Sequence, residues 1–179
     1  MKHVKALSLI LLLTVFSMPA SAEKPDAAKA FQQLSGLVGN WMGKSESGRQ
    51  HSVNYRLSAG GTVLVETWSL SSGRESMTMY HLDGDDLMAT HYCPQGNQPR
   101  LLLVSDAGKM HFEFRDGTNL KVPDKAHQHS FWLQINDSGH FQRNEIYVDN
   151  VRTGHVPAEE NPQDTFSYTR KDDSADTKK

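Results

Sequence analysis

The sequence predicts an all-β protein: an antiparallel up-and-down β-barrel of about 8–10 strands, preceded by a short N-terminal helix. Beyond residue 38, apolar and polar residues alternate with period two, which is typical of half-buried strands. Turn residues recur about every 8–12 residues with no long helical pattern between them, which indicates a sandwich or a barrel. Sequential hairpins favour the barrel, because closure removes the exposed edges of a sheet.

Composition excludes several classes of protein. The chain has 179 residues, 37% of them hydrophobic, which fits one globular domain and excludes disordered, collagen-like and multi-span membrane chains. A formal charge of -2 argues against a nucleic-acid binder. The single cysteine, Cys93, excludes an intrachain disulfide and a multi-cysteine metal site. We expect a buried thiol there, with an intermolecular disulfide or a ligand role as alternatives.

Residues 1–22 have the pattern of a secretory signal peptide. Lys2 and Lys5 precede an apolar run over 6–16, and an Ala-x-Ala cleavage motif ends at Ala22. The apolar run is shorter than the ~20 residues that span a bilayer, although a retained N-terminal anchor is the alternative. We therefore expect cleavage after Ala22, a periplasmic or secreted location and no stable membrane insertion afterwards. Cleavage removes two lysines and no acid, so the formal charge falls from -2 to -4.

The predicted barrel domain spans residues 31–170, between a linker or helix start at 23–30 and a charged, disordered tail at 171–179. Apolar residues at helical spacing predict a helix over 26–35 with Asp26 as its N-cap. The predicted strand segments are 41–46, 52–57, 62–69, 77–82, 87–93, 100–105, 110–115, 128–136, 141–148, 151–156 and 165–170. A barrel of this size can enclose one small ligand.

Both ends of the predicted barrel resemble lipocalin-like (calycin) barrels. Gly39-Asn40-Trp41 is similar to their opening element, in which a Gly-x-Trp sequence starts the first strand and the Trp plugs one barrel end. Phe166-x-Tyr168-x-Arg170 resembles their closing strand, whose basic residue stacks on that Trp. The resemblance implies structural roles for Gly39, Trp41 and Arg170; the alternative is an ordinary core Trp and an Arg that merely precedes the tail.

A closer resemblance covers residues 77–100. Met77 to Asp85, Thr90 to Cys93 and Gly96 to Arg100 are similar to a family of exported bacterial proteins of unknown function. That resemblance implies a lipocalin-like fold and export rather than an activity. A more distant resemblance, to nitrobindin-type haem barrels, implies haem as an alternative cofactor, with no histidine of this chain matched to its ligand.

One polar segment, residues 91–100, is the main candidate for a ligand site. His91 and Cys93 share a strand face, and Asn97 and Arg100 supply donors suited to a carboxylate or phosphate. The predicted ligand-binding residues are His81, His91, Tyr92, Cys93, Asn97, Gln98, Arg100, Met77 and Met79. The alternative is a structural loop whose amides cap strand ends and whose Arg pairs with an acid, beside methionines that are ordinary core.

A second candidate is a zinc or copper site. His127 and His129 share a strand face, and His111 with His91 or Cys93 could complete a ligand set. Exposed histidines without metal are the alternative, and no cofactor is our primary expectation.

These patterns predict an exported barrel that binds a small, mainly apolar ligand with a polar or acidic head group. The alternatives are a metal- or haem-binding barrel, with or without catalysis, and a structural or interaction domain with a filled core. No Gly-x-Ser-x-Gly, His-Glu-x-x-His or phosphate-loop motif is present, which favours binding over catalysis.

Overall fold

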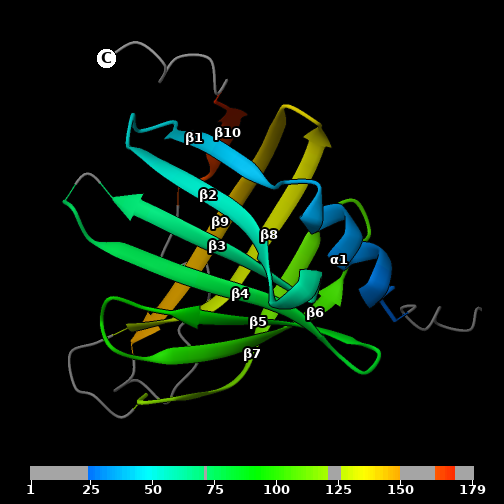
Figure 1. Cartoon of the computed structure of the whole chain (residues 1–179). Coiled ribbons are helices and arrows are strands. Elements are labelled where there is room, and N and C mark those ends of the chain that lie inside the picture. The colour runs from blue at the N-terminus through cyan, green and yellow to red at the C-terminus, as the bar shows by residue number, and fades with distance from the viewer. Residues whose placement is uncertain (1–23, 71, 121–125, 150–163, 172–179) are drawn as a thin grey trace, which may run out of the picture.

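The computed structural model describes residues 24–70, 72–120, 126–149 and 164–171. Within these ranges one short α-helix precedes ten strands, which close into a barrel (Figure 1). The elements are α1 (Ala27–Ser35), β1 (Gly39–Ser45), β2 (Gln50–Ser58), the 3₁₀ turn η1 (Ala59–Gly61), β3 (Val63–Leu70), β4 (Glu75–Asp83), β5 (Asp86–Tyr92), β6 (Gln98–Ser105), β7 (Met110–Thr118), β8 (Ala126–Asp137), β9 (His140–Asp149) and β10 (Phe166–Arg170).

Each strand pairs antiparallel with its neighbour in the chain, and β10 closes the barrel against β1. The predicted fold class is therefore confirmed. The predicted helix is also confirmed: the Asp26 carboxylate accepts a hydrogen bond from the backbone N–H of Lys29 at 3.0 Å, as an N-cap does. The signal peptide, the predicted strand 151–156 and residues 172–179 of the predicted tail lie outside the described residues. Across the described ranges, no helix has both the length and the hydropathy needed to cross a membrane.

The inner face of the barrel changes character along its axis. The half next to α1 is filled by large apolar and aromatic side chains. There the rings of Phe112 and Phe131 stack at 4.6 Å, and those of Phe141 and Tyr168 stack at 4.2 Å. The opposite half, where the β3–β4 and β5–β6 connections lie, carries polar and charged side chains instead. The filled half gives the fold its hydrophobic stabilisation and leaves the polar half as the place for a site.

Trp41 and Arg170 hold the α1 end together. The buried Trp41 indole donates its N–H to the Leu37 carbonyl at 2.7 Å, and the Arg170 guanidinium lies 4.3 Å from the Trp41 ring centroid. Arg170 also donates to the carbonyls of Val38 and Ser138, at 2.7 and 3.1 Å. The stacking implied by the resemblance is thus present, and it joins β10 to the α1–β1 connection and to the β8–β9 turn.

Gly39 is expected to be essential for this closure. Its φ of +133° disfavours any other residue, and a Cβ there would lie 2.6 Å from Nη1 of Arg170. We expect Gly39→Ala to lower the free energy of unfolding by about 1–3 kcal/mol, measured by urea denaturation. Gly48→Ala is the control, because Gly48 also has a positive φ, +85°, but open space around its Cβ position. A loss no larger than that of the control would contradict a steric role for Arg170.

Candidate functional site: a buried charge network beside a cavity

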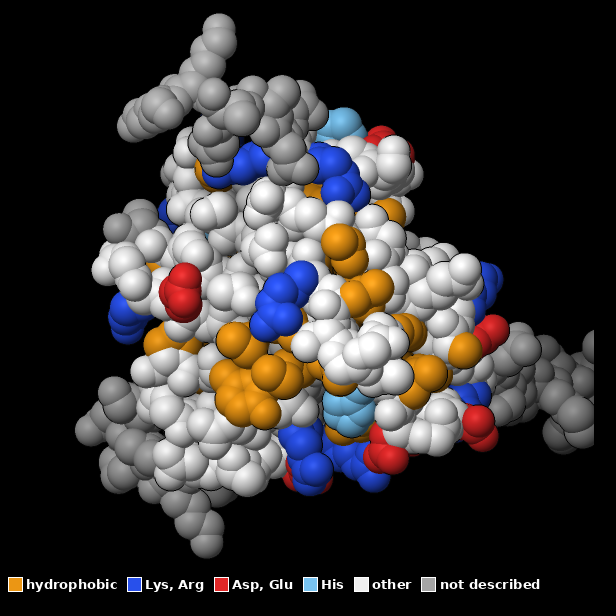
Figure 2. All heavy atoms as spheres, viewed as in Figure 1, with side chains coloured by type: hydrophobic (Ala, Val, Ile, Leu, Met, Phe, Trp, Pro, Cys, Tyr) orange, Lys and Arg blue, Asp and Glu red, His pale blue; other side chains and the backbone are white. Residues whose placement is uncertain are grey.

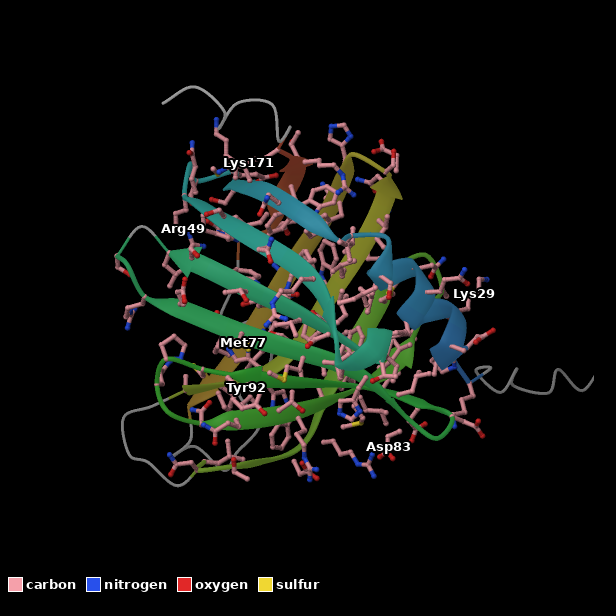
Figure 3. The ribbon with its side chains drawn as sticks, in the orientation of Figure 1. Lys29, Arg49, Met77, Asp83, Tyr92 and Lys171 are labelled. Atoms are coloured by element: carbon pink, nitrogen blue, oxygen red, sulfur yellow. The ribbon has the colours of Figure 1, made fainter. Side chains whose placement is uncertain are left out.

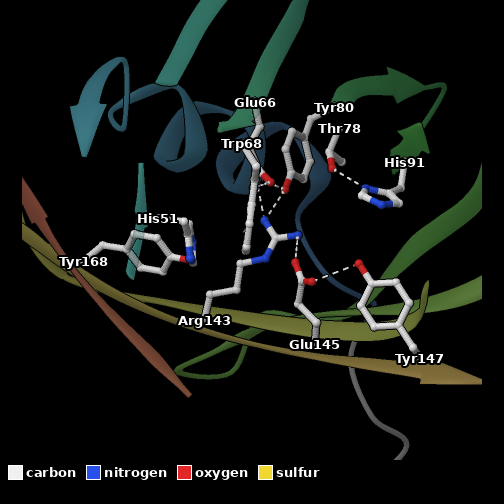
Figure 4. A network of polar contacts seen from close by, with 10 residues as sticks. All are labelled: His51, Glu66, Trp68, Thr78, Tyr80, His91, Arg143, Glu145, Tyr147 and Tyr168. Carbon is white, nitrogen blue, oxygen red and sulfur yellow. Dashed lines mark hydrogen bonds and ion pairs between the residues drawn. The ribbon is translucent and has the colours of Figure 1, made fainter. Parts of the chain in front are cut away.

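The polar half of the barrel is built from alternating residues of several strands. On β9, Arg143, Glu145 and Tyr147 are two residues apart, so their side chains share the inner face. Glu66 and Trp68 do the same on β3. Figure 4 shows how these side chains meet in one network although they come from distant parts of the chain.

Arg143 and Glu66 form the centre of this network. Both are almost completely inaccessible, with side-chain exposures of 1% and 0%, and Nη1 of Arg143 lies 2.6 Å from Oε2 of Glu66. The Tyr80 hydroxyl donates to the same carboxylate at 2.6 Å and accepts from Nη1 at 3.0 Å, while the Trp68 indole donates to Oε1 of Glu66. A buried ion pair is tolerated only with such additional hydrogen bonds, because desolvation of each charge costs several kcal/mol.

Glu145 is a second carboxylate on the same guanidinium. Its Oε1 lies 2.8 Å from Nη2 of Arg143, in an ion pair rather than an aligned hydrogen bond, and its Oε2 accepts from the Tyr147 hydroxyl at 3.1 Å. Burial raises the pKa of Glu145, and Arg143 opposes that shift. Burial alone would lower the pKa of Arg143, but Glu66 and its other partners hold it well above the ordinary value. Arg143 is therefore a permanent cation between two carboxylates.

Two buried histidines flank the network. His51 stacks on Trp68 at 4.3 Å and shares a hydrogen bond of 2.8 Å with the Tyr168 hydroxyl, so Trp68 lies between His51 and the guanidinium (Figure 4). His91, only 3% exposed, shares a hydrogen bond of 3.0 Å between Nδ1 and the Thr78 hydroxyl. Its Nε2 is buried and has no hydrogen-bond partner in the described part of the chain. Burial, assisted by Arg143, lowers the pKa of His51 to about 4 and that of His91 to about 3.

A cavity of about 210 Å³ opens beside the network at the barrel end opposite α1. Residues of β3, β5 and β9 form much of its wall, including Trp68, Leu70, His91, Glu145 and Tyr147, and Cys93 directly after β5 also lines it. The cavity wall therefore includes part of the buried network and His91, whose buried Nε2 has no hydrogen-bond partner among the described residues.

Of the predicted ligand-binding residues, His91 and Cys93 lie in the cavity wall. Asn97 is buried, but its amide donates to the Ala126 carbonyl at 2.9 Å. Gln98 donates to the Gly96 carbonyl at 3.1 Å. Arg100 forms a bidentate pair with Asp116 in an exposed position, since Leu101 takes the inward direction. These contacts match the structural alternative, in which the amide caps a strand end and the Arg pairs with an acid.

The other predicted lining residues lie on the outer face of the barrel. On β4 the inward positions belong to Thr78 and Tyr80, which places Met77, Met79 and His81 outside and only half-buried. Tyr92 is 44% exposed and pairs with Met77 across the strands (Figure 3). Hydrophobic side chains gather at that position on the surface in Figure 2. The expectation that these four residues line the cavity is wrong, because a shift of one residue moves a strand side chain to the opposite face.

The structure does not assemble the predicted metal site. His127 and His129 lie beside the Phe114 ring, at 4.9 and 5.6 Å, where the pairing of β7 with β8 has ended. His111 instead lines a surface hollow with Trp132. No group of three or more His, Cys, Asp or Glu residues within the described ranges could hold a metal ion.

The haem alternative also lacks a fitting site among the described residues. His140 pairs with Asp137 on the exposed β8–β9 turn, and His155 lies outside the described residues. The cavity beside His91 is far smaller than a porphyrin requires, since even drug-sized ligands occupy roughly 300–1,000 Å³.

The lowered pKa of His91 predicts acid sensitivity of the fold. The unfolded chain binds a proton below about pH 6.5, whereas the folded state resists it until about pH 3. The contribution of His91 is therefore complete above pH 6.5 and is lost as the pH falls, by up to about 1.4 kcal/mol for each pH unit.

We expect His91→Gln to flatten the decline in the free energy of unfolding between pH 6.5 and 4.5, measured by urea titrations at each pH. The outward-facing His81→Gln variant is the control and should follow the unsubstituted protein. Equal slopes for all three proteins would show that His91 does not cause the decline.

Comparisons with known proteins give distant likenesses only. No protein family and no curated protein matches this chain. The chain is similar to a solved structure of unknown function from the DUF3598 family of Nostoc punctiforme PCC 73102, with 13% identity, a TM-score of 0.46 and coverage of 78% of this chain and 49% of that chain. It therefore spans about half the length of that protein.

Two further solved structures have comparable or weaker similarity. Rv2717c from M. tuberculosis has 16% identity and a TM-score of 0.46 over 82% of this chain and 100% of that one. EF1p2_mFAP2b bound to DFHBI has 14% identity and a TM-score of 0.34 over 82% and 98%. Likenesses at this level carry no argument about function.

Proposed function

We propose that this protein binds a small molecule in the cavity between β3, β5 and β9. One observation carries the proposal: the cavity adjoins a buried Glu66–Arg143–Glu145 network and His91, whose buried Nε2 has no partner among the described residues. Replacing a buried ion pair by well-packed apolar residues is often neutral or stabilising, so stability alone does not account for this network. Small-molecule sites, in contrast, need a few precisely placed polar groups in a concave surface.

The volume of the cavity limits the size of the ligand, which the sequence alone does not. The cavity volume of about 210 Å³ lies below the roughly 300–1,000 Å³ of pockets for drug-sized ligands, which indicates a compact ligand. The outward positions of Met77 and Met79 leave no long apolar lining on β4. We therefore propose a compact ligand that is polar or partly polar, in place of the mainly apolar ligand expected from the sequence.

The pattern of residues 1–22 supports binding outside the cytoplasm. We expect protein exported under its own signal to begin at Glu23, which N-terminal sequencing detects. Retention of residues 1–22 would contradict cleavage without bearing on the cavity.

The binding proposal is tested by native mass spectrometry of the exported protein, with thermal-shift measurements against a library of small polar fragments. We expect a co-purifying molecule or a stabilising fragment, and we expect Ser76→Phe, at the cavity wall, to abolish it. Ser69→Phe is the matched control, because Ser69 lies nearby on β3 but is exposed. A protein with no bound molecule and no stabilising fragment would instead support a structural domain.

A further inference from the structure

We infer that the protein has a second binding site, for a pyranose sugar, in the surface hollow beside Trp132. The hollow lies on the outer face of the barrel, over β6, β7 and β8, where the β6–β7 turn approaches α1. It is therefore separate from the cavity between β3, β5 and β9, which opens at the opposite end of the barrel. Its volume is about 420 Å³, within the roughly 300–1,000 Å³ of small-molecule sites.

Trp132 supplies the aromatic wall of this hollow. Trp41 and Trp68 are buried, with exposures of 0% and 9%, whereas Trp132 is only half-buried. The indole N–H groups of Trp41 and Trp68 donate to protein acceptors, but that of Trp132 has no acceptor among the described residues. An indole in this setting offers a ligand both an apolar face and a hydrogen-bond donor.

Three polar side chains accompany the ring. Strand pairing places His111 of β7 directly opposite Trp132, and Ser105 of β6 directly opposite His111. Gln134, two residues further along β8, shares the outer face with Trp132. The side chains of His111 and Gln134 form no hydrogen bond or ion pair with any described residue. Donors and acceptors therefore lie on two sides of an apolar ring and are available to a ligand.

This combination favours a sugar ring over other ligands. A pyranose with equatorial hydroxyls, such as a glucoside, presents C–H groups on its faces and hydroxyls around its edge. The C–H groups suit the negative face of an indole. The hydroxyls both donate and accept, which suits the Ser, His and Gln side chains. A flat aromatic ligand would use only the ring, and an open-chain polyol would use only the polar groups.

Lys109, on the β6–β7 turn, already occupies the indole face. Its Nζ lies 3.7 Å from the centroid of the Trp132 ring, so this face is open to a group from outside β8. A cation–π contact is weak at an exposed site, and a ligand can displace the ammonium at little cost. The ammonium forms no ion pair with a described residue. Once displaced, it can donate a hydrogen bond to a sugar oxygen.

An NMR titration of the isotope-labelled protein tests the inference, because each of its three tryptophans gives an indole N–H signal. The probe is methyl β-D-glucopyranoside, which we expect to shift the Trp132 signal saturably and to leave those of Trp41 and Trp68 in place. Sorbitol, which has hydroxyls but no ring, and caffeine, which has flat rings but no hydroxyl, should bind at least tenfold more weakly. An unchanged Trp132 signal, or equal binding of sorbitol or caffeine, would overturn the inference.

Variants locate the contact by saturation-transfer NMR, which observes the ligand and needs no indole signal. Trp132→Ala is expected to abolish binding of the glucoside, whereas Tyr92→Ala, which removes another exposed aromatic ring from the outer face, should leave it unchanged. Gln134→Ala should weaken binding severalfold, and Gln50→Ala at an exposed position of β2 is its control. Because Trp132 and Gln134 are not core residues, both variants are expected to fold. Unchanged binding in Trp132→Ala would overturn the inference.

Binding beside Trp132 should not depend on the cavity at the other end of the barrel. Ser76→Phe, which changes the wall of that cavity, is expected to leave glucoside binding unchanged. Loss of glucoside binding in this variant, with an unaltered circular dichroism spectrum, would place the sugar in the cavity and overturn the assignment to Trp132. Failure of the glucoside to bind at all would overturn this second site and leave the proposed function of the cavity standing.

Discussion

Arg143→Met is expected to lower the free energy of unfolding by about 3–5 kcal/mol, because it leaves two carboxylates, Glu66 and Glu145, without their counter-charge. Glu66 is 0% exposed and would retain only the hydrogen bonds from Tyr80 and Trp68. The guanidinium also lies 4.2 Å from the Phe131 ring and 5.0 Å from the Trp68 ring, so its loss removes packing in the middle of the barrel. Urea denaturation at pH 7, followed by circular dichroism, measures the change.

A double variant separates charge from packing. In Arg143→Met with Glu66→Gln, no unpaired carboxylate remains at position 66, and we expect recovery of more than half of the loss. The control is Arg49→Met, because Arg49 pairs with Asp164 at the surface, where an ion pair contributes only about 0–1 kcal/mol. Failure of the double variant to recover stability would mean that the Glu66 charge does not determine the cost, which would then come from packing or from Glu145.

The fold could be predicted because its determinants are local. Period-two alternation and glycine-containing turns placed most of the strands near their observed positions. Asp26 marked the start of α1, since an N-cap depends on residues within one helical turn. The contact between Trp41 and Arg170 is distant in sequence, and it was anticipated through a resemblance rather than through periodicity.

The charge network could not be predicted in the same way. Glu66 and Arg143 are 77 residues apart, and only closure of the barrel brings them together. On β9 one face carries Phe141, Arg143, Glu145 and Tyr147, while the other carries two polar and two apolar residues. Neither face is simply apolar, so hydropathy does not determine which one is inside. Phe141 and Tyr147, at the two ends of the face that carries Arg143, are the signal in the sequence that this face points inward.

The same polar interior explains the incorrect placement of β4. Met77 and Met79 are the more hydrophobic set, so the usual rule assigns them to the inside. Thr78 and Tyr80 take those positions because each supplies a hydroxyl that a buried group requires: Thr78 for His91 and Tyr80 for Glu66. Where the interior of a barrel is polar, hydrogen-bond partners predict orientation better than hydropathy does.

Trp41→Ala is expected to lower the free energy of unfolding by about 3–5 kcal/mol, as for other large aromatic residues removed from a core. Trp41 is fully buried, its ring meets the edge of Phe141 at 4.9 Å, and it carries both the hydrogen bond to Leu37 and the stacked Arg170. The substitution therefore removes core volume and also releases the α1–β1 connection. Urea denaturation gives the size of the loss, and faster proteolytic cleavage near α1 would show the release.

The control is Trp132→Ala, because Trp132 lies on the outer face and contacts Lys109 at 3.7 Å, in a cation–π arrangement that contributes about 0.5–1 kcal/mol at exposed sites. Similar losses for the two variants would contradict the role of Trp41 as the closure of the barrel. Trp41→Phe should keep enough of the packing to remain folded. Trp41 lies in the half of the barrel next to α1. This variant should therefore bind a ligand at the opposite end with unchanged affinity. That result would separate the half of the interior that stabilises the fold from the half that we assign to binding.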